Sequence, residues 1–387
     1  MRRTSSRVVA AGLLAVLVAS GFLATIPARA ETLADPDEWT IAVYGCADNN
    51  LEGAWDKYTN PYLLGIPTND LVNVVAAVDR YSTIGTETIE YAYGTATVVA
   101  TDEEMNFGAW PTLVWFLQDV VATYPSDKLA VVLWDHGGGW YGVCEDDSQG
   151  GWMNIDNLQL AIQTAGVYID LLGFDACMMS SIEVVYSMHL TGMVGMMVAS
   201  EQLVPYNGFP YDLMFAPLSA DPYETPEQVA DDMVAGWGVY YGNKGWVDLS
   251  ALNVPVLGEA VMDEFKTWVA AMDSSLTVNH DDYAMAFKKS EMVRNWYICD
   301  FNLFVNTLLK DRDVVDQTLR DASTALLSAI DLGVNLQAGG GKNPLSGVTF
   351  WFGMEGEYTN YGVLYEAWLP FASDTGWFAF VTNFNTM

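Results

Sequence analysis

The sequence predicts an α/β fold, with a mainly parallel sheet flanked by helices on both faces, then a mostly helical C-terminal insertion and a late returning strand. Strand-like and helix-like segments alternate over residues 39–250. This alternation is typical of a doubly covered parallel sheet. From about Asp248 helical spacing takes over, across Val256–Met272 and Asn302–Leu332. After a glycine-rich loop, Val348–Phe352 has the composition of a strand again.

Short apolar runs bounded by turn residues predict the buried strands. They cover residues 39–45, 71–79, 88–99, 129–134, 168–174 and 193–199. The spacing between them predicts helices around Leu113–Val121, Asn157–Ile162 and Met178–His189. The first of these should end near Tyr124, because a proline follows it. The Gly/Pro stretch 203–211 is a predicted loop, and loops at strand ends commonly carry function.

Residues 1–30 have the layout of a secretory signal peptide. Three arginines precede the uncharged run Val8–Ile26, and Ala28-Arg29-Ala30 supplies a small-residue cleavage site. An uncleaved anchor is the alternative, since this run could nearly span a bilayer. The position of the cleavage site favours removal. We therefore expect a secreted protein with no stable membrane anchor.

The chain is strongly acidic. Loss of residues 1–30 removes four arginines and no acidic residue, which moves the formal net charge from −33 to −37. Such a charge disfavours nucleic acid and anionic membranes and attracts cationic peptides, although it also simply favours solubility. Dense carboxylates could bind Ca²⁺. The sequence contains no Asp-x-Asp-x-Asp-Gly loop, so it places no calcium site and indicates no certain cofactor.

The chain has four cysteines, and secretion would permit disulfides. Cys46 ends the first predicted strand and Cys144 lies shortly after a run of three glycines, so a bridge between them is an open alternative. The pairing of Cys299 is equally undetermined. No CxxC pair or His/Cys cluster occurs, and we expect no zinc site.

Two predicted strands each end in a residue suited to catalysis. Residues 129–134 run into Asp135-His136 and three glycines, and residues 169–174 run into Asp175-Ala176-Cys177. Carboxyl ends of parallel strands share one edge of a sheet. His136 and Cys177 should therefore meet, as a thiolate nucleophile and its acid/base partner must. The alternative is a buried structural cysteine, which is the commoner fate of a lone one.

The strings LWDHGGGW (133–140) and GFDACMMS (173–180), in this order, resemble the clostripain family of secreted cysteine peptidases, relatives of caspases, gingipains and legumain. Further similar segments are 39–44, 47–52, 199–201, 205–211 and 347–352. The resemblance implies a caspase-like fold. It divides the chain into a signal peptide (1–30), a peptidase domain (31–250), a mostly helical region (251–337) and a C-terminal segment packing on the peptidase domain (338–387).

The resemblance also implies roles for the site residues. Cys177 would be the nucleophile, with a thiol pKa lowered by the N-terminus of the helix expected after it. His136 would protonate the leaving amine and help to activate the thiol. The backbone N–H groups of Gly137 and Cys177 would form the oxyanion hole. Asp135 would either orient His136 or simply end its strand.

Specificity for a basic residue is implied by Asp175. It lies two residues before Cys177, on the same face of an extended strand, and in relatives the matching aspartate lines the pocket for the residue before the scissile bond. Glu201 is a second candidate for this pocket. The alternative is that Asp175 only holds a turn through local N–H groups.

The combined prediction is a secreted cysteine endopeptidase that cuts protein or peptide substrates after Arg or Lys. One rival is a catalytically silent acidic binding or surface protein on the same fold, which thiol labelling would separate. Another is a Cys-His amidase or transpeptidase, which a substrate panel with free amine acceptors would reveal. No Lys or Arg occurs between Leu129 and Asn243, so a basic-specific enzyme could not cut itself there.

Overall fold

The computed structural model describes residues 37–242, 244–310, 316–341 and 345–387. Residues 36–387 form one compact unit. The predicted signal peptide lies outside the described residues, and the predicted boundaries near 250 and 337 stay predictions. No helix in the described part of the chain is both long enough and apolar enough to cross a membrane.

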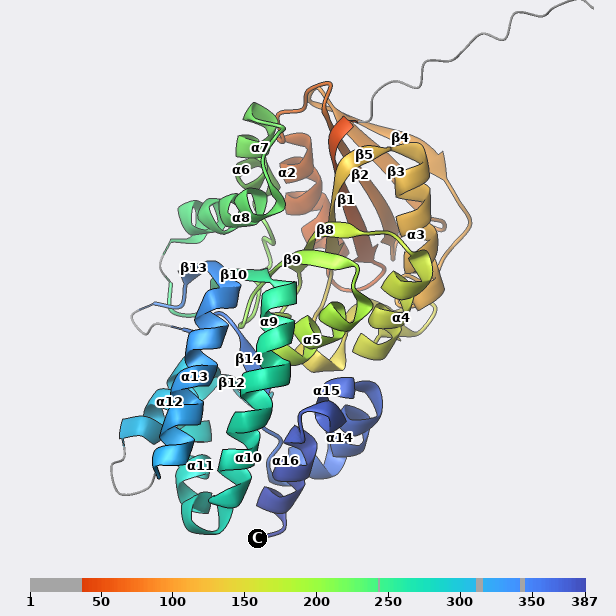
Figure 1. Cartoon of the computed structure of the whole chain (residues 1–387). Coiled ribbons are helices and arrows are strands. Elements are labelled where there is room, and N and C mark those ends of the chain that lie inside the picture. The colour runs from red at the N-terminus through yellow and green to blue at the C-terminus, as the bar shows by residue number, and fades with distance from the viewer. Residues whose placement is uncertain (1–36, 243, 311–315, 342–344) are drawn as a thin grey trace, which may run out of the picture. The chain divides into compact units, whose positions relative to one another are not determined.

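A nine-stranded sheet forms the centre of the unit, in the order β13-β10-β9-β8-β5-β1-β2-β3-β4 (Figure 1). Its five central strands are mutually parallel. They are β9 (Val194–Ala199), β8 (Ile169–Asp175), β5 (Ser126–Trp134), β1 (Asp37–Ala47) and β2 (Val72–Arg80). The predicted mainly parallel α/β class is therefore confirmed.

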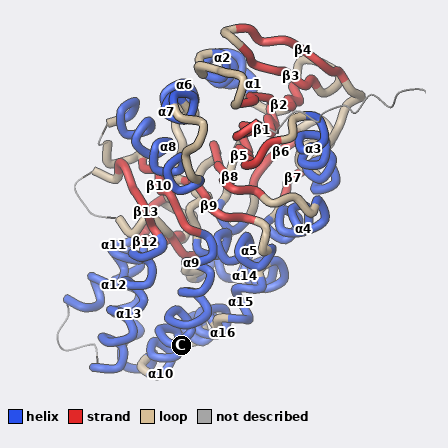
Figure 2. The backbone as a smooth tube through the Cα atoms, turned by 45° about the horizontal axis from the view of Figure 1, so that its top comes forward, coloured by secondary structure: helices blue, strands red, loops and turns tan. Residues whose placement is uncertain are grey.

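Helices cover both faces of this sheet (Figure 2). Alternate residues of β5 face two different cores: Val131 and Leu133 pack with α3 (Trp110–Thr123), α4 (Ile155–Ala165) and α5 (Ile182–Thr191). Ala130 and Val132 pack in the other core. The helices of that face include η1 (Trp55–Thr59), α2 (Asn60–Leu64), α6 (Tyr211–Met214), α7 (Ala216–Ala220) and α8 (Pro226–Tyr241). Burial on both faces explains why the central strands are apolar throughout.

The edges of the sheet are antiparallel. On one edge β3 (Glu87–Ala92) and β4 (Thr95–Thr101) form a hairpin, so the prediction of a single strand over residues 88–99 is wrong. Tyr93 and Gly94, with φ of 51° and 72°, reverse the chain between them. A two-residue hairpin turn of this kind requires positive φ at both positions. On the other edge lie β10 (Asp248–Asn253) and β13 (Val334–Gly339).

The region after β10 is mostly helical, as predicted. Its helices are α9 (Val254–Ala260), η3 (Val261–Phe265), α10 (Lys266–Ser274), α11 (Leu276–Ser290), α12 (Phe301–Lys310) and α13 (Gln317–Gly333). The late strand exists as β14 (Thr349–Trp351), but it pairs with β12 (Ile298–Asp300) in a three-stranded sheet with β11 (Glu291–Val293). The strand that returns to the large sheet is β13. Helices α14 (Glu355–Trp368), α15 (Pro370–Asp374) and α16 (Trp377–Asn385) follow.

Candidate active site

His136 and Cys177 follow the carboxyl ends of β5 and β8, two neighbouring central strands of the sheet. The strands are neighbours, with Trp134 opposite Asp175. The two segments that follow these strands stay in contact at Gly137. A β-carbon added to Gly137 would lie 2.4 Å from the carbonyl oxygen of Cys177. Only glycine fits this close approach. The register of two parallel strands thus sets the distance between the two loops that carry the candidate dyad.

A cavity of ≈ 260 Å³ lies between these loops, and both His136 and Cys177 line it. The remaining lining residues come from the segment after β1, the ends of β5 and β8, and the loop after β9: Leu51, Ala54, Trp134, Asp135, Asp175, Val204, Pro205, Tyr206 and Gly208. The predicted loop 203–211 therefore borders the site.

The surroundings of Cys177 favour the neutral thiol. Burial raises its pKa, and the backbone N–H of Val204, which donates to Sγ at 3.3 Å, offsets this rise only in part. The expected helix at Met178 begins instead at Ile182, and Met178 itself has a φ of 63°. A helix N-terminus therefore does not adjoin Cys177. The prediction that it lowers the thiol pKa is wrong.

His136 is held by a residue that the sequence analysis did not assign. Its Nε2 lies 2.8 Å from Oδ1 of Asn50, which follows β1. Burial lowers the pKa of the imidazole, although the charges of Glu145 and Asp147 oppose this. In the neutral ring Nε2–H donates to Asn50, which leaves Nδ1 as the nitrogen able to accept a proton. Because β1 is adjacent to β5, the polar residues that follow β1 could have indicated this contact from the sequence.

Asp135 fixes the loops around His136. One of its carboxylate oxygens accepts from Nδ2 of Asn49 at 2.7 Å, and the other accepts from the backbone N–H of Glu145. Asn49 Nδ2 also donates to the carbonyl oxygens of Cys46 and Glu145. Asp135 was predicted either to orient His136 or simply to end its strand. The contacts described here join it to Asn49 and Glu145 and not to the imidazole ring.

Asp175 lines the cavity and is only 3% exposed. Its Oδ2 accepts hydrogen bonds from the backbone N–H of Phe209 at 2.9 Å and from the hydroxyl of Tyr211 at 3.1 Å. Its Oδ1 has no hydrogen-bond partner among the described residues. Burial raises its pKa to about 7. The carboxylate therefore both holds the neighbouring loop and keeps one oxygen for another partner.

Glycine at position 208 gives Asp175 its room. A β-carbon there would lie 2.8 Å from Oδ2 of Asp175, and the residue has a φ of 66°. Both facts exclude larger residues without rearrangement.

The structure does not bring Glu201 to this cavity. Its side chain is fully buried, and it is absent from the cavity lining. Burial raises the pKa of its carboxyl group well above the usual range, and the charges of Asp300 and Asp248 add to this rise. The expectation that Glu201 contributes to a substrate pocket is therefore corrected.

None of the other cysteines and histidines lines this cavity, although the backbone N–H of Cys144 donates to the carbonyl oxygen of His136 at 3.2 Å. Cys46, Cys144 and Cys299 are buried free thiols, so the structure contains no Cys46–Cys144 bridge. The thiol of Cys46 donates instead to the carbonyl oxygen of Phe107 at 3.6 Å. His189 packs against Gly258, and His280 stacks on Phe384.

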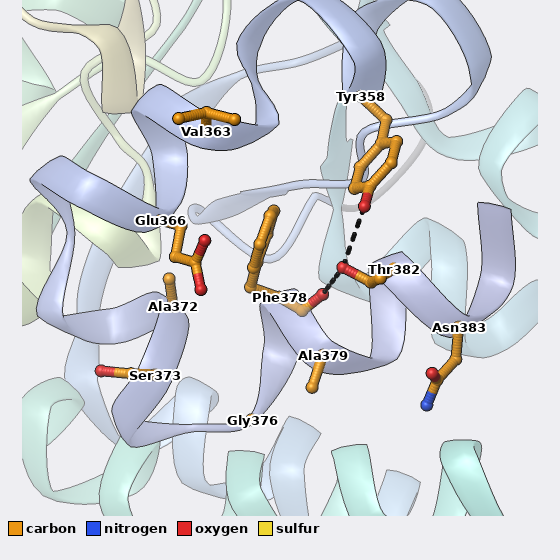
Figure 3. A pocket seen from close by; sticks show the side chains of 10 residues that line it. All are labelled: Tyr358, Val363, Glu366, Ala372, Ser373, Gly376, Phe378, Ala379, Thr382 and Asn383. Atoms are coloured by element: carbon orange, nitrogen blue, oxygen red, sulfur yellow. Dashed lines mark hydrogen bonds between the residues drawn. The ribbon is translucent and has the colours of Figure 1, made fainter. Parts of the chain in front are cut away.

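A larger cavity of ≈ 480 Å³ lies among α14, α15 and α16 (Figure 3). Tyr358 and Thr382 are hydrogen-bonded along its wall. Its lining contains no cysteine or histidine and none of the predicted site residues. The chemistry of a nucleophile and a base is present in the smaller cavity beside Cys177.

Comparisons with known proteins show the family and the fold. The model of the clostripain family matches residues 43–327. Clostripain from Hathewaya histolytica is 27% identical in an alignment 304 residues long, and the match covers 66% of this chain and 54% of that protein. The chain thus spans about half the length of this curated relative.

Two solved structures share the fold. A secreted C11 cysteine protease from Bacteroides thetaiotaomicron, in complex with an irreversible peptide inhibitor, has a TM-score of 0.68 at 19% identity and covers 88% of this chain and 99% of its own. An inactive zymogen C11 protease from Parabacteroides distasonis also has a TM-score of 0.68 at 19% identity, with 89% and 99% covered.

Proposed function

The chain belongs to the clostripain family of cysteine peptidases, and on that basis we propose that it is a secreted cysteine endopeptidase that cuts after arginine or lysine. The proposed specificity rests on the Oδ1 atom of Asp175, which has no hydrogen-bond partner among the described residues. Asp175 lines the same cavity as Cys177 and His136. A guanidinium or ammonium group entering this cavity would neutralise a buried carboxylate. Charge-assisted hydrogen bonds of this kind are among the stronger ones in proteins.

The reaction follows from the protonation states of the pair. Nδ1 of neutral His136 takes the proton of the Cys177 thiol as the thiolate attacks the peptide carbonyl carbon. The oxyanion of the tetrahedral intermediate accepts hydrogen bonds from the backbone N–H groups of Gly137 and Cys177, two residues whose backbones lie close together. The imidazolium then protonates the leaving amine. Water attacks the acyl-enzyme and restores the free thiol, with His136 again acting as the base.

A peptide panel tests this function. Fluorogenic peptides that differ only in the residue before the cut should show hydrolysis after Arg and Lys, and little after Gln or Glu. A free amine acceptor in the same reaction distinguishes hydrolysis from transpeptidation. Preferred cleavage after an uncharged or acidic residue, or transfer to the amine as the main product, would refute the proposal.

The value of kcat/KM for an Arg substrate should depend on pH because the carboxyl group of Asp175 titrates. Its carboxyl group is mostly neutral below a pKa of about 7 and cannot then pair with a cation. The ratio of kcat/KM for an Arg substrate to that for a matched Gln substrate should therefore rise as the pH increases through about 7. His136 affects both substrates alike, so the ratio isolates the pocket. A ratio that stays constant with pH would contradict the role of Asp175.

The active enzyme should be a single chain that begins near Glu31. The hairpin of β6 (Val143–Asp146) and β7 (Gly151–Met153) exposes residues 147–150, and exposed loops are preferred sites of cleavage. No basic residue occurs there or elsewhere from 129 to 243. A denaturing gel and N-terminal sequencing of active material would check this. Two fragments joined between His136 and Cys177, absent from Cys177→Ala, would contradict both the single chain and the basic specificity.

A further inference from the structure

A cavity of ≈ 200 Å³ outside the catalytic one is lined mainly by aromatic rings. Its lining residues come from three segments that are far apart in the chain: Trp140, Tyr141, Asn295, Trp296, Glu357 and Tyr361. Pockets that hold drug-sized ligands are larger, at roughly 300–1,000 Å³, so this volume suits a single side chain. We name this cavity the aromatic cage.

The rings of the cage meet nearly at right angles. The ring of Tyr141 lies 5.8 Å from that of Trp140 at 86°, and 6.0 Å from that of Tyr361 at 89°. Trp152 holds Tyr141 in place, because its Nε1–H donates to the carbonyl oxygen of Tyr141 at 3.1 Å. Trp140 is 3% exposed, whereas Trp296 and Tyr361 are 39% and 36% exposed. The cage therefore has one buried wall and other walls that reach solvent.

One carboxylate lies among these rings. Glu357 precedes Tyr361 by four residues in α14, so both side chains share a face of that helix. Glu357 is half-buried, and its carboxylate makes no hydrogen bond or ion pair within the part of the chain that the structure describes. Burial raises its pKa to about 6, so the group is mostly ionised at neutral pH. An unpaired carboxylate beside aromatic rings is complementary to a cation.

The protein does not fill the cage with a cation of its own. The lining contains no lysine or arginine. The cation–π contacts seen in the described ranges involve other rings, those of Trp39, Tyr58, Tyr241 and Trp246. A cation that occupies the cage would therefore come from another molecule.

The cage adjoins the loop that carries His136. A β-carbon added to Gly138 would lie 3.3 Å from the ring of Trp296. Gly138 is two residues after His136 and directly follows Gly137, the proposed oxyanion-hole donor. One residue of an extended peptide spans at most about 3.6 Å. The cage is therefore within reach of a substrate residue that lies close to the reacting bond.

The cage and the cavity beside Cys177 adjoin opposite faces of the sheet. Ala54 and Trp134, which line the cavity beside Cys177, belong to one core, and Trp140 belongs to the other. In the proposed reaction the residue before the cut occupies the cavity beside Cys177, and His136 protonates the amine of the residue after the cut. The part of the substrate that follows the cut is therefore the part nearest to the cage.

We propose that the aromatic cage is a second substrate subsite, which binds a lysine or arginine side chain at one of the first two positions after the cut. This inference rests on the proposed peptidase function and extends it from one basic residue to a pair that flanks the cut. The ammonium or guanidinium group would lie over the rings and pair with Glu357. The net charge of −33 acts in the same direction, because it attracts cationic peptides.

Peptides that share an arginine before the cut and differ only after it test the subsite. Lysine should give a kcat/KM about 5- to 30-fold above that of norleucine, its uncharged analogue, at one of the first two positions after the cut. Phenylalanine should not reach the value of lysine, and glutamate should fall below norleucine. Mass spectrometry of the products should show that each peptide is cut after the same arginine.

Variants of the cage identify the groups responsible. Glu357→Gln keeps the shape of the side chain and removes its charge, so the ratio of kcat/KM for lysine to that for norleucine should fall to about one. Trp296→Ala removes an exposed ring and should lower the ratio by about threefold or more. Glu355→Gln is the matched control, because Glu355 is an exposed carboxylate in the same helix and does not line the cage. It should keep the wild-type ratio.

Binding measurements separate this inference from the proposed function. In calorimetry with Cys177→Ala protein, the lysine peptide should bind at least about fivefold more tightly than the norleucine peptide. Absence of cleavage after arginine, with this preference in binding intact, would support the subsite and refute the proposed specificity. Equal binding and equal kcat/KM for lysine and norleucine would overturn the subsite. So would a preference for phenylalanine over lysine, an unchanged ratio in folded Glu357→Gln, or an equal loss in Glu355→Gln.

Discussion

Cys177→Ala is expected to abolish peptide hydrolysis, with a fall in kcat/KM of about 10⁴-fold or more. The substitution removes the atom that would form the acyl-enzyme. Few packing contacts are lost, because Cys177 is partly exposed at the cavity and, among the described residues, its thiol is hydrogen-bonded to the backbone of Val204 alone. Fluorogenic peptide assays beside circular dichroism and thermal unfolding would separate lost catalysis from lost structure. Normal hydrolysis by folded Cys177→Ala protein would refute the proposed mechanism.

Cys299→Ala is the matched control. Cys299 is another free thiol, but it lies in β12 of the small sheet and is fully buried. Its removal should leave kcat/KM within a few-fold of wild type. A loss as large as that of Cys177→Ala would show that thiol removal in general, rather than loss of the nucleophile, explains the result.

Asp175→Asn should lower kcat/KM for Arg substrates by about 30- to 5,000-fold. This corresponds to a loss of roughly 2–5 kcal/mol in transition-state stabilisation. An asparagine has the shape of the aspartate and can still accept from the N–H of Phe209 and the hydroxyl of Tyr211 through its oxygen. Its amide nitrogen would then face the cavity, where it cannot pair with a cation. The specificity for basic residues should be lost while the loop stays in place.

The comparison that isolates this effect is between substrates. Hydrolysis of a matched Gln peptide by Asp175→Asn should change little, and alkylation of Cys177 by a small uncharged reagent should proceed at the wild-type rate. Equal losses for Arg and Gln peptides would mean that Asp175 serves only to hold the 208–211 loop. Glu201→Gln serves as the matched control, because Glu201 is buried away from the cavity and should not alter the preference for Arg.

The sequence predicted the parts of the site that depend on local pattern. Apolar runs that end in polar residues identified β5 and β8, and the rule that parallel strands share an edge placed His136 beside Cys177. Asp175 followed from the same strand end. These inferences needed only the order of residues along two neighbouring segments.

The remaining features depend on contacts between segments far apart in the chain. Asn50 reaches His136 because β1 happens to lie next to β5. β13 has little strand character, and it forms by pairing with β10 at an edge of the sheet. Packing likewise sets the turn at Met178, so that α5 begins only at Ile182. It also sets the burial that raises the pKa of the Cys177 thiol. Glu201 seemed suited to the pocket from its position in sequence, but its side chain is buried beside Asp248 and Asp300.

The most direct test of the central claim is to locate a covalent adduct. A peptide chloromethyl ketone that ends in arginine should label the wild-type enzyme at one site, and peptide mapping by mass spectrometry should place the adduct on Cys177. A matched reagent that ends in glutamate should react far more slowly, and Cys177→Ala should remain unlabelled. An adduct on Cys46, Cys144 or Cys299, or equal labelling by the arginine and glutamate reagents, would contradict an active site built from Cys177, His136 and Asp175.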